Sequence, residues 1–300
     1  MTKLKIKSMM KKIFIGILSL AMSTISCTNN DDNNNPNPLG NLVLNLNGLE
    51  ALGSDFVYEG WIIVDGVPIS TGTFSSVTFP QTFEINAQML SEATMFVLSI
   101  EPINDPDPAP SATKILAGSF SGSNAEVSSS TIVGDFSSSS GNYILATPTD
   151  TDDTNEESGV WFLDDSSGSM MSGLNLPVLT EGWKYEGWAV MNGTPISTGT
   201  FTNVSGFDDN ATTSPYKGDA GNGPAFPGED YLQNAPSGLT FPTDLRGATI
   251  VISVEPDPDN DPAPFTFKPL AHTVPANATV HSVIGMGNGP LQELSGSVTR

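Results

Sequence analysis

The sequence is 300 residues long and carries 33 acidic against 11 basic residues, with one cysteine. A chain this acidic repels nucleic acid and anionic lipid headgroups, which excludes both as primary ligands. A single cysteine also excludes an intramolecular disulfide framework.

The N-terminus predicts a lipoprotein signal peptide over residues 1–26. Five lysines precede a short apolar core, IFIGILSL at 13–20, which is too short to cross a membrane as a helix. Cys27 follows this core and resembles the lipidated cysteine of bacterial lipoproteins. The alternative is an ordinary signal peptide with an incidental cysteine. We favour lipidation, because a free thiol is unusual in an exported protein.

The composition of residues 27–38 predicts a disordered tether. Apart from Cys27, the segment reads TNNDDNNNPNP and holds no large apolar side chain whose burial could offset the entropy of ordering it. Asp31 and Asp32 resemble the acidic export signal of surface lipoproteins in the Bacteroidetes, whereas the alternative is a plain polar spacer. We therefore expect a lipid-anchored protein of the cell envelope, in the outer membrane, which faces outward if Asp31 and Asp32 act as the export signal and faces the periplasm if they do not.

Two stretches of the chain occur twice. Residues 58–74 and 185–201 share 12 of 17 positions, and residues 97–110 and 251–264 share 9 of 14. Repeats this dense indicate two copies of one structural unit. The offset between the copies grows from 127 to 154 residues, so the second copy carries an insertion, which we place within 207–236. We predict domains at 39–165 and 173–300.

Strand patterns dominate both copies. Phe96, Leu98 and Ile100 share one face, and both faces around Trp61 are apolar, which is typical of a covered central strand. Short strands separated by Asn-Gly and Asp-Gly turns predict an all-β protein of two tandem, immunoglobulin-like β-sandwich domains. We predict that 143–145 pairs with 160–163 around the acidic run 150–158; the alternative is that this run is the domain linker.

The repeated motifs resemble the extracytoplasmic domain of the anti-sigma-K factor family. The residues that carry the resemblance are Tyr58, Trp61, Pro68, Ser70, Gly72, Phe74, Glu101 and Pro102 in copy one, and Tyr185, Trp188, Pro195, Ser197, Gly199, Phe201, Glu255 and Pro256 in copy two. The resemblance implies a β-rich sensing or docking domain without an active site. Only an export signal and a polar stretch precede the first copy, so we do not expect it to sequester a sigma factor directly.

Carboxylates after the second motif are the candidate ligand contacts. Alternating aspartates could present oxygen ligands to Ca2+, although the prolines between them equally favour a solvated loop that binds no ion: Asp105, Asp107, Asp257, Asp259 and Asp261. Glu101 and Glu255 each end an apolar strand before a proline. Each could contact a ligand or accept hydrogen bonds from the backbone of the neighbouring turn.

Three further features bear on function. Trp61 and Trp188 could form an aromatic platform for sugars, or could pack inward as tryptophans in apolar strands usually do. His272 and His281 have no recognisable catalytic or metal-binding partners, so we assign no catalytic residue and expect no enzyme. The insertion could carry partner specificity, or could be disordered. We expect an envelope lipoprotein that docks a protein partner; the alternative is a glycan- or calcium-binding surface module.

Overall fold

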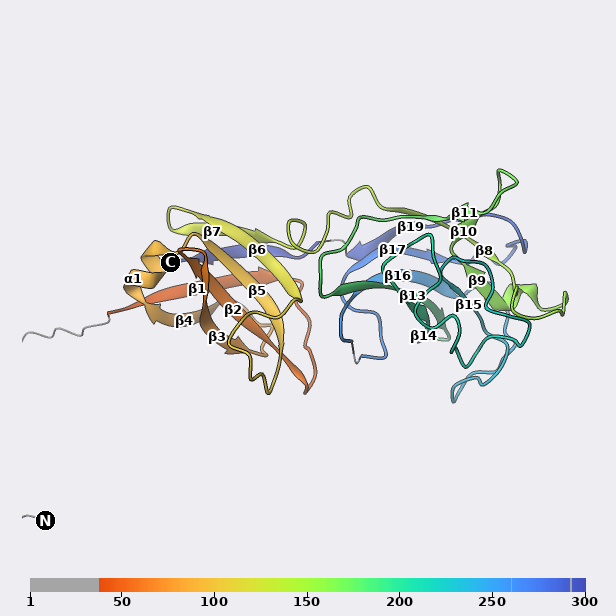
Figure 1. Cartoon of the computed structure of the whole chain (residues 1–300), viewed down its shortest axis with the longest axis horizontal. Coiled ribbons are helices and arrows are strands. Elements are labelled where there is room, and N and C mark those ends of the chain that lie inside the picture. Colours follow the sequence, from red (N-terminus) through yellow and green to blue (C-terminus); the bar gives the residue numbers. More distant parts are fainter. Residues whose placement is uncertain (1–37, 260, 292) are drawn as a thin grey trace, which may run out of the picture. The chain divides into compact units, whose positions relative to one another are not determined.

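The computed structural model describes residues 38–259, 261–291 and 293–300 (Figure 1). The predicted signal peptide at 1–26, the lipidation of Cys27 and the tether up to residue 37 lie outside the described residues. Strands make up 43% and helices 3% of the structure, which confirms the all-β prediction. Several antiparallel sheets build a sandwich-like fold.

The first repeat forms an eight-stranded antiparallel sheet in the order β3-β2-β5-β6-β7-β20-β1-β4. One short helix, α1 (Ala87–Glu92), follows β4. The rings of Phe74 and Phe83 from the two edge strands lie 5.7 Å apart, so the sheet curls around its core. The strands are β1 (Leu39–Asn47), β2 (Phe56–Val64), β3 (Val67–Phe74), β4 (Gln81–Asn86), β5 (Met95–Pro102), β6 (Lys114–Ser121), β7 (Asn124–Ser128) and β20 (Ser295–Thr299).

The second repeat forms a five-stranded antiparallel sheet in the order β14-β13-β16-β17-β19. A second sheet has the order β12-β8-β9-β15, with β18 paired to β8. Its packing against the five-stranded sheet is shown by the ring of Phe162, which follows β9 and lies against Gly187 of β13. The elements are β8 (Ser140–Leu145), the 3-10 helix η1 (Glu156–Ser158), β9 (Gly159–Trp161), β10 (Leu163–Asp164), β11 (Met171–Ser172), β12 (Leu174–Asn175), β13 (Trp183–Met191), β14 (Thr194–Phe201), β15 (Gly228–Asp230), β16 (Thr249–Pro256), β17 (Lys268–Thr273), β18 (Ile284–Gly285) and β19 (Gly287–Leu291).

The sheets do not divide where the sequence placed the domain boundary at 165–173. The C-terminal strand β20 pairs with β1 and β7, with Val298 opposite Leu44 and Ala125, so 295–299 belongs to the first sheet (Figure 1). Strands β8 and β9, which we assigned to residues 39–165, pair with β15 and β18 of the second repeat. Backbone pairing between strands far apart in sequence leaves no periodic signal, so the sequence could not reveal it.

The predicted strand pair around the acidic run is confirmed. Ile144 stands opposite Trp161 and Leu145 opposite Val160, so residues 150–158 connect two paired strands and are not a domain linker. Trp161 is 2% exposed and Phe162 is fully buried. Burial of these two aromatic side chains stabilises the strand pair.

The repeated Gly-Trp and Thr-Gly residues form a β-bulge in each copy. The register of β2 and β3 shifts between Gly60 and Trp61, as that of β13 and β14 does between Gly187 and Trp188. A Cβ added to Gly60 would come within 3.0 Å of the Thr71 hydroxyl, closer than real Cβ atoms come. Gly72, opposite Gly60, has a φ of 107°, which favours glycine. The bulge therefore requires glycine at both positions.

The tyrosine at the start of each motif anchors its strand to the preceding loop. The Tyr58 hydroxyl donates to the Glu50 carbonyl at 2.8 Å, and the Tyr185 hydroxyl donates to the Pro177 carbonyl at 2.6 Å, in each case eight residues upstream. The rings pack on Phe74 and Phe201, with centroids 5.6 Å apart in both copies.

Tyr185→Phe is expected to lower the free energy of unfolding by about 1 kcal/mol, because it leaves the part-buried Pro177 carbonyl without its donor while keeping the ring. Urea denaturation of the variant and the wild type measures the difference. A variant as stable as the wild type would show that this hydrogen bond does not anchor the loop.

Candidate functional site

A chain of buried hydrogen bonds recurs in the two repeats and uses the predicted glutamates. Trp61 Nε1 donates to Ser99 Oγ at 2.8 Å, Ser99 donates to Glu101, and Glu101 Oε1 accepts from the Ser111 amide at 2.9 Å. In the second repeat Trp188 Nε1 donates to Ser253 Oγ at 2.7 Å and Ser253 donates to Glu255. Both tryptophans are 3% exposed, so they pack inward and form no sugar platform.

The two glutamates differ in one respect. Both oxygens of Glu255 accept from the Phe265 amide, at 3.0 and 3.1 Å, so this carboxyl acts as a structural acceptor. Glu101 Oε2 accepts no hydrogen bond from any described residue, although the side chain is only 1% exposed. Burial raises the pKa of Glu101, and it raises the pKa of Glu255 to about 8.

An open groove of about 340 Å³ lies over this hydrogen-bond chain in the first repeat. Four carboxylates line it, and within the described part of the chain no basic residue is among its lining side chains. The Ser70 hydroxyl donates to the Glu59 carboxylate in its wall. The groove is lined by Val57, Glu59, Trp61, Ser70, Thr73, Glu101, Pro102, Ile103, Asp105, Asp107 and Pro108.

The alternating aspartates mainly hold their own loops in shape. Asp105 and Asp107 accept the amides of the residues two positions ahead, at 2.9 and 3.0 Å, and Asp259 and Asp261 do the same at 2.9 Å. Asp257 lies 3.5 Å from Lys184. Across 38–259, 261–291 and 293–300, no group of three or more acidic, histidine or cysteine side chains is placed to hold a metal ion. The loops thus show turn-capping carboxylates, of which Asp105 and Asp107 also face the groove.

The same face of the second repeat is occupied by the chain itself. The Asp209 amide donates to the Thr200 carbonyl at 2.8 Å, and the Asp209 carboxylate accepts from Thr200 Oγ1 at 2.8 Å and from Lys184 Nζ at 3.1 Å. Thr200 and Lys184 are the counterparts of Thr73 and Val57 in the groove of the first repeat. The insertion therefore covers in one repeat a surface that is open in the other.

The insertion is otherwise an ordered part of the second core, so it is not the disordered excursion that was the alternative to a specificity loop. Residues 228–230 pair with β9, and Tyr231 is fully buried. The rings of Tyr216, Tyr231 and Phe241 pack against one another at 5.4 to 6.0 Å. Alternation of apolar residues is weak across 207–236, so no local pattern predicted this packing.

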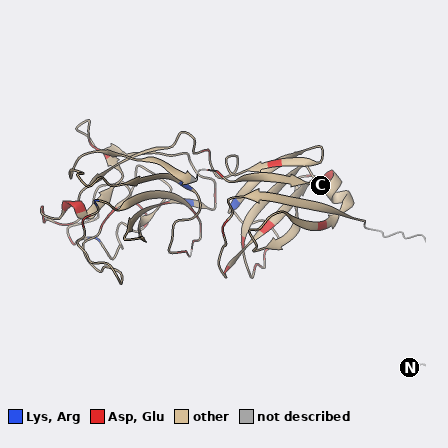
Figure 2. Ribbon diagram, turned by 180° about the vertical axis from the view of Figure 1, so that it is seen from behind, with Lys and Arg blue, Asp and Glu red and all other residues tan. Residues whose placement is uncertain are grey.

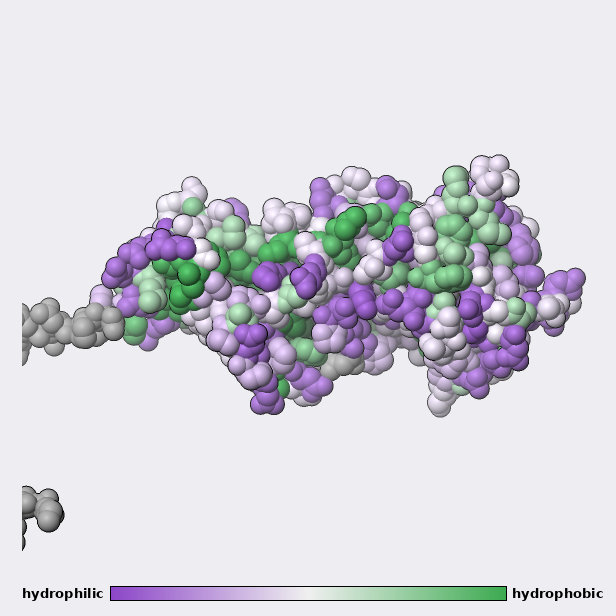
Figure 3. Space-filling model, in the orientation of Figure 1, coloured by the Kyte–Doolittle hydropathy of each residue, from purple (hydrophilic) through white to green (hydrophobic). Residues whose placement is uncertain are grey.

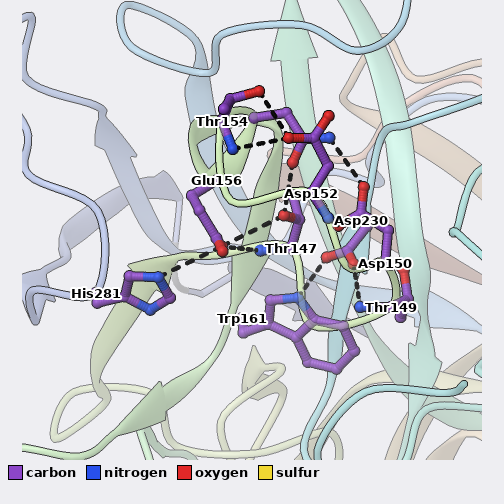
Figure 4. Close-up of polar contacts among 10 residues, drawn as sticks. Thr147, Thr149, Asp150, Asp152, Thr154, Glu156, Trp161, Asp230 and His281 are labelled. Carbon is purple, nitrogen blue, oxygen red and sulfur yellow. Dashed lines mark hydrogen bonds and ion pairs between the residues drawn. The ribbon is translucent and has the colours of Figure 1, made fainter. Parts of the chain in front are cut away.

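Asp230 joins the insertion to the predicted strand pair (Figure 4). Its carboxylate accepts from the Trp161 indole at 2.7 Å, from the Thr149 amide at 2.8 Å and from the Thr149 hydroxyl. Burial raises the pKa of Asp230 to about 6. Nearby, Glu156 accepts from the Thr147 amide at 2.7 Å and lies 3.4 Å from His281. These contacts connect strands and loops, which is a structural role.

The other histidine is also in a structural contact, since His272 Nδ1 lies 2.9 Å from the Tyr143 hydroxyl. Neither histidine approaches the groove of the first repeat, whose lining holds none. The structure thus brings Glu101, Asp105 and Asp107 together in one groove. Asp257 and Glu255 lie beside Lys184, and Asp259 and Asp261 line a separate pocket with Glu50.

Acidic and hydrophobic residues are both spread over the surface of the protein (Figure 2, Figure 3). Acidic residues far outnumber basic ones along the ribbon (Figure 2). Hydrophobic residues on the face shown in Figure 3 lie in patches bordered by hydrophilic ones. The most exposed large apolar side chains come from separate segments: Leu39, Val67, Ile103, Met170, Met171 and Val178.

Comparison with known proteins finds no matching family model, no matching curated protein and no matching solved structure. Among the described residues, no helix has the length and apolar character needed to cross a membrane.

Proposed function

We propose that this chain is a non-enzymatic lipoprotein of the bacterial cell envelope, held in the outer membrane through Cys27, whose repeats dock a partner protein. The resemblance of its motifs to the outer domain of anti-sigma-K factors supports a role in envelope signalling. The leader and Cys27 support the location. The buried carboxyl groups of Glu101, Glu255 and Asp230 accept hydrogen bonds from neighbouring strands and loops, which is a structural role.

One observation carries the docking role: the face that is open in the first repeat holds a polypeptide segment in the second. Residue Asp209 lies across the edge of β14, with its amide bonded to the strand and its side chain bonded to Thr200 and Lys184. Addition of a segment to a sheet edge is a common mode of peptide recognition. The first repeat lacks the insertion, so another chain can take the equivalent place on β3.

A pull-down of envelope extract on immobilised residues 37–300, which form one compact unit, tests this function. We expect one envelope protein to be retained by the wild type and lost when Glu59→Gln alters the groove. Glu84→Gln, an exposed change of the same kind on β4, serves as the control. Retention of polysaccharide, or binding that chelator abolishes, would favour the glycan- or calcium-binding module. If the extract yields no bound protein, the docking function is wrong.

A further inference from the structure

We propose that the groove of the first repeat binds the guanidinium group of an arginine in an extended segment of the partner. This inference rests on the docking function and specifies its ligand. It follows from the charge of the groove, from one unpartnered buried oxygen, and from the way the second repeat fills the same face.

The negative charge of the groove favours a cationic ligand. Glu59, Glu101, Asp105 and Asp107 line it without a basic residue among the lining side chains of the described chain. The second repeat supplies its own cation, since Lys184 lies 3.1 Å from Asp209 and 3.5 Å from Asp257. Val57 takes the position of Lys184 in the first repeat, directly across the ladder from Glu101. The first repeat therefore lacks the positive charge that its counterpart contains.

The unpartnered Oε2 atom of Glu101 favours a ligand that donates a hydrogen bond. Glu101 forms part of the groove wall and is 1% exposed, and its Oε2 receives no hydrogen bond from the described residues. The corresponding oxygen of Glu255 accepts from the Phe265 amide at 3.1 Å. A buried carboxylate oxygen without a donor is unfavourable, so a ligand that brings an N–H group here gains more than it would at an exposed carboxylate.

Guanidinium fits these requirements better than ammonium. Its planar fork of donors matches carboxylates, and it is weakly hydrated, which suits a groove whose wall also holds Pro102, Ile103 and Pro108. In the second repeat the cation is Lys184 of β13, and a separate polypeptide segment lies beside it. There the segment at Asp209 bonds to the strand edge through its backbone and places its side chain on the same face. A partner segment on β3 at Thr73 could do the same with an arginine.

Calorimetric titration of residues 37–300 at low ionic strength tests the proposal with three peptides, Ac-Gly-Arg-Arg-Gly-NH2 and its lysine and citrulline equivalents. We expect the arginine peptide to bind about tenfold more tightly than the citrulline peptide, which keeps the shape without the charge. The lysine peptide should bind with intermediate affinity. Calcium chloride alone is the fourth titrant, and it should neither bind in the groove nor compete with the arginine peptide.

Three variants identify the groove as the binding site. Glu59→Gln removes one carboxylate without changing shape, and Val57→Lys supplies the cation of the second repeat; we expect each to weaken the arginine peptide about tenfold or more. Glu84→Gln should leave the affinity unchanged. Circular dichroism establishes that each variant is folded. Equal binding of arginine and citrulline peptides, or binding unaffected by both groove variants, overturns the proposal, as does calcium binding that displaces the arginine peptide.

This result is separable from the docking function. If the envelope partner binds Val57→Lys as well as the wild type, the docking function stands and the groove is not its site. If the arginine peptide binds in the groove but no envelope protein is retained, the ligand chemistry stands and the proposed partner class is wrong.

Discussion

Gly159→Ala is expected to lower the free energy of unfolding by about 3 kcal/mol, because the site has no room for a methyl group. A Cβ there would come within 3.0 Å of the Ala146 carbonyl oxygen and of Asp230 Oδ1. The Ala146 oxygen is backbone of the neighbouring strand and cannot rotate away. Asp230 is fixed by Trp161 and Thr149, so the methyl group would force the strand pair apart. Urea denaturation of residues 37–300 measures the loss.

Gly206→Ala is the matched control for this change. Its nearest neighbour would be Asn203 Nδ2 at 3.5 Å, an ordinary contact in a loop. Both substitutions restrict the unfolded chain in the same way, so the difference between the two variants isolates the steric effect. If Gly159→Ala unfolds at the same urea concentration as Gly206→Ala, the packing of β8 and β9 on the insertion is not as described.

The free energy of unfolding is expected to fall as the pH rises from about 4.5 to about 8, by about 3 kcal/mol or more in total. Burial raises the pKa of Glu255 and Glu229 to about 8, of Glu186 to about 7, and of Asp208 to about 6. In the unfolded chain these groups ionise near their ordinary values, so the unfolded state loses its protons first. Stability is therefore complete below about pH 4.5 and is lost as each folded carboxyl ionises.

Glu255→Gln assigns part of this pH dependence to one residue. The amide oxygen can still accept from the Phe265 amide, but the side chain does not ionise, so we expect the fall in stability between about pH 5 and 8.5 to shrink by about 2 kcal/mol. Urea denaturation at the two pH values measures it, with exposed Glu84→Gln as the control. Stability that is flat or rises across this window would contradict the raised pKa values.

The candidate site was only half visible in the sequence. The repeat singled out Glu101 and Glu255 as equivalent positions, and the alternating aspartates drew attention to the loops that follow them. Both glutamates accept hydrogen bonds from backbone amides, as a buried carboxyl group requires. Which of the two repeats has an open face could not be predicted, because it depends on where Asp209 lies in space. Asp209 bonds to Thr200 at the edge of β14, and no sequence pattern indicates that contact.

The sequence by itself determined the strand content, the two copies of the bulged motif, and the pairing of β8 with β9. These follow from local rules: side-chain alternation, glycine where a bulge needs it, and aromatic residues that must be buried. Only the tertiary structure decided that β20 completes the first sheet and that Glu229 and Asp230 are buried. It also decided that the groove of one repeat is open while its counterpart is partly covered by Asp209. Pairing between distant strands and desolvation of a carboxyl depend on which segments meet in space, and chain order does not record that.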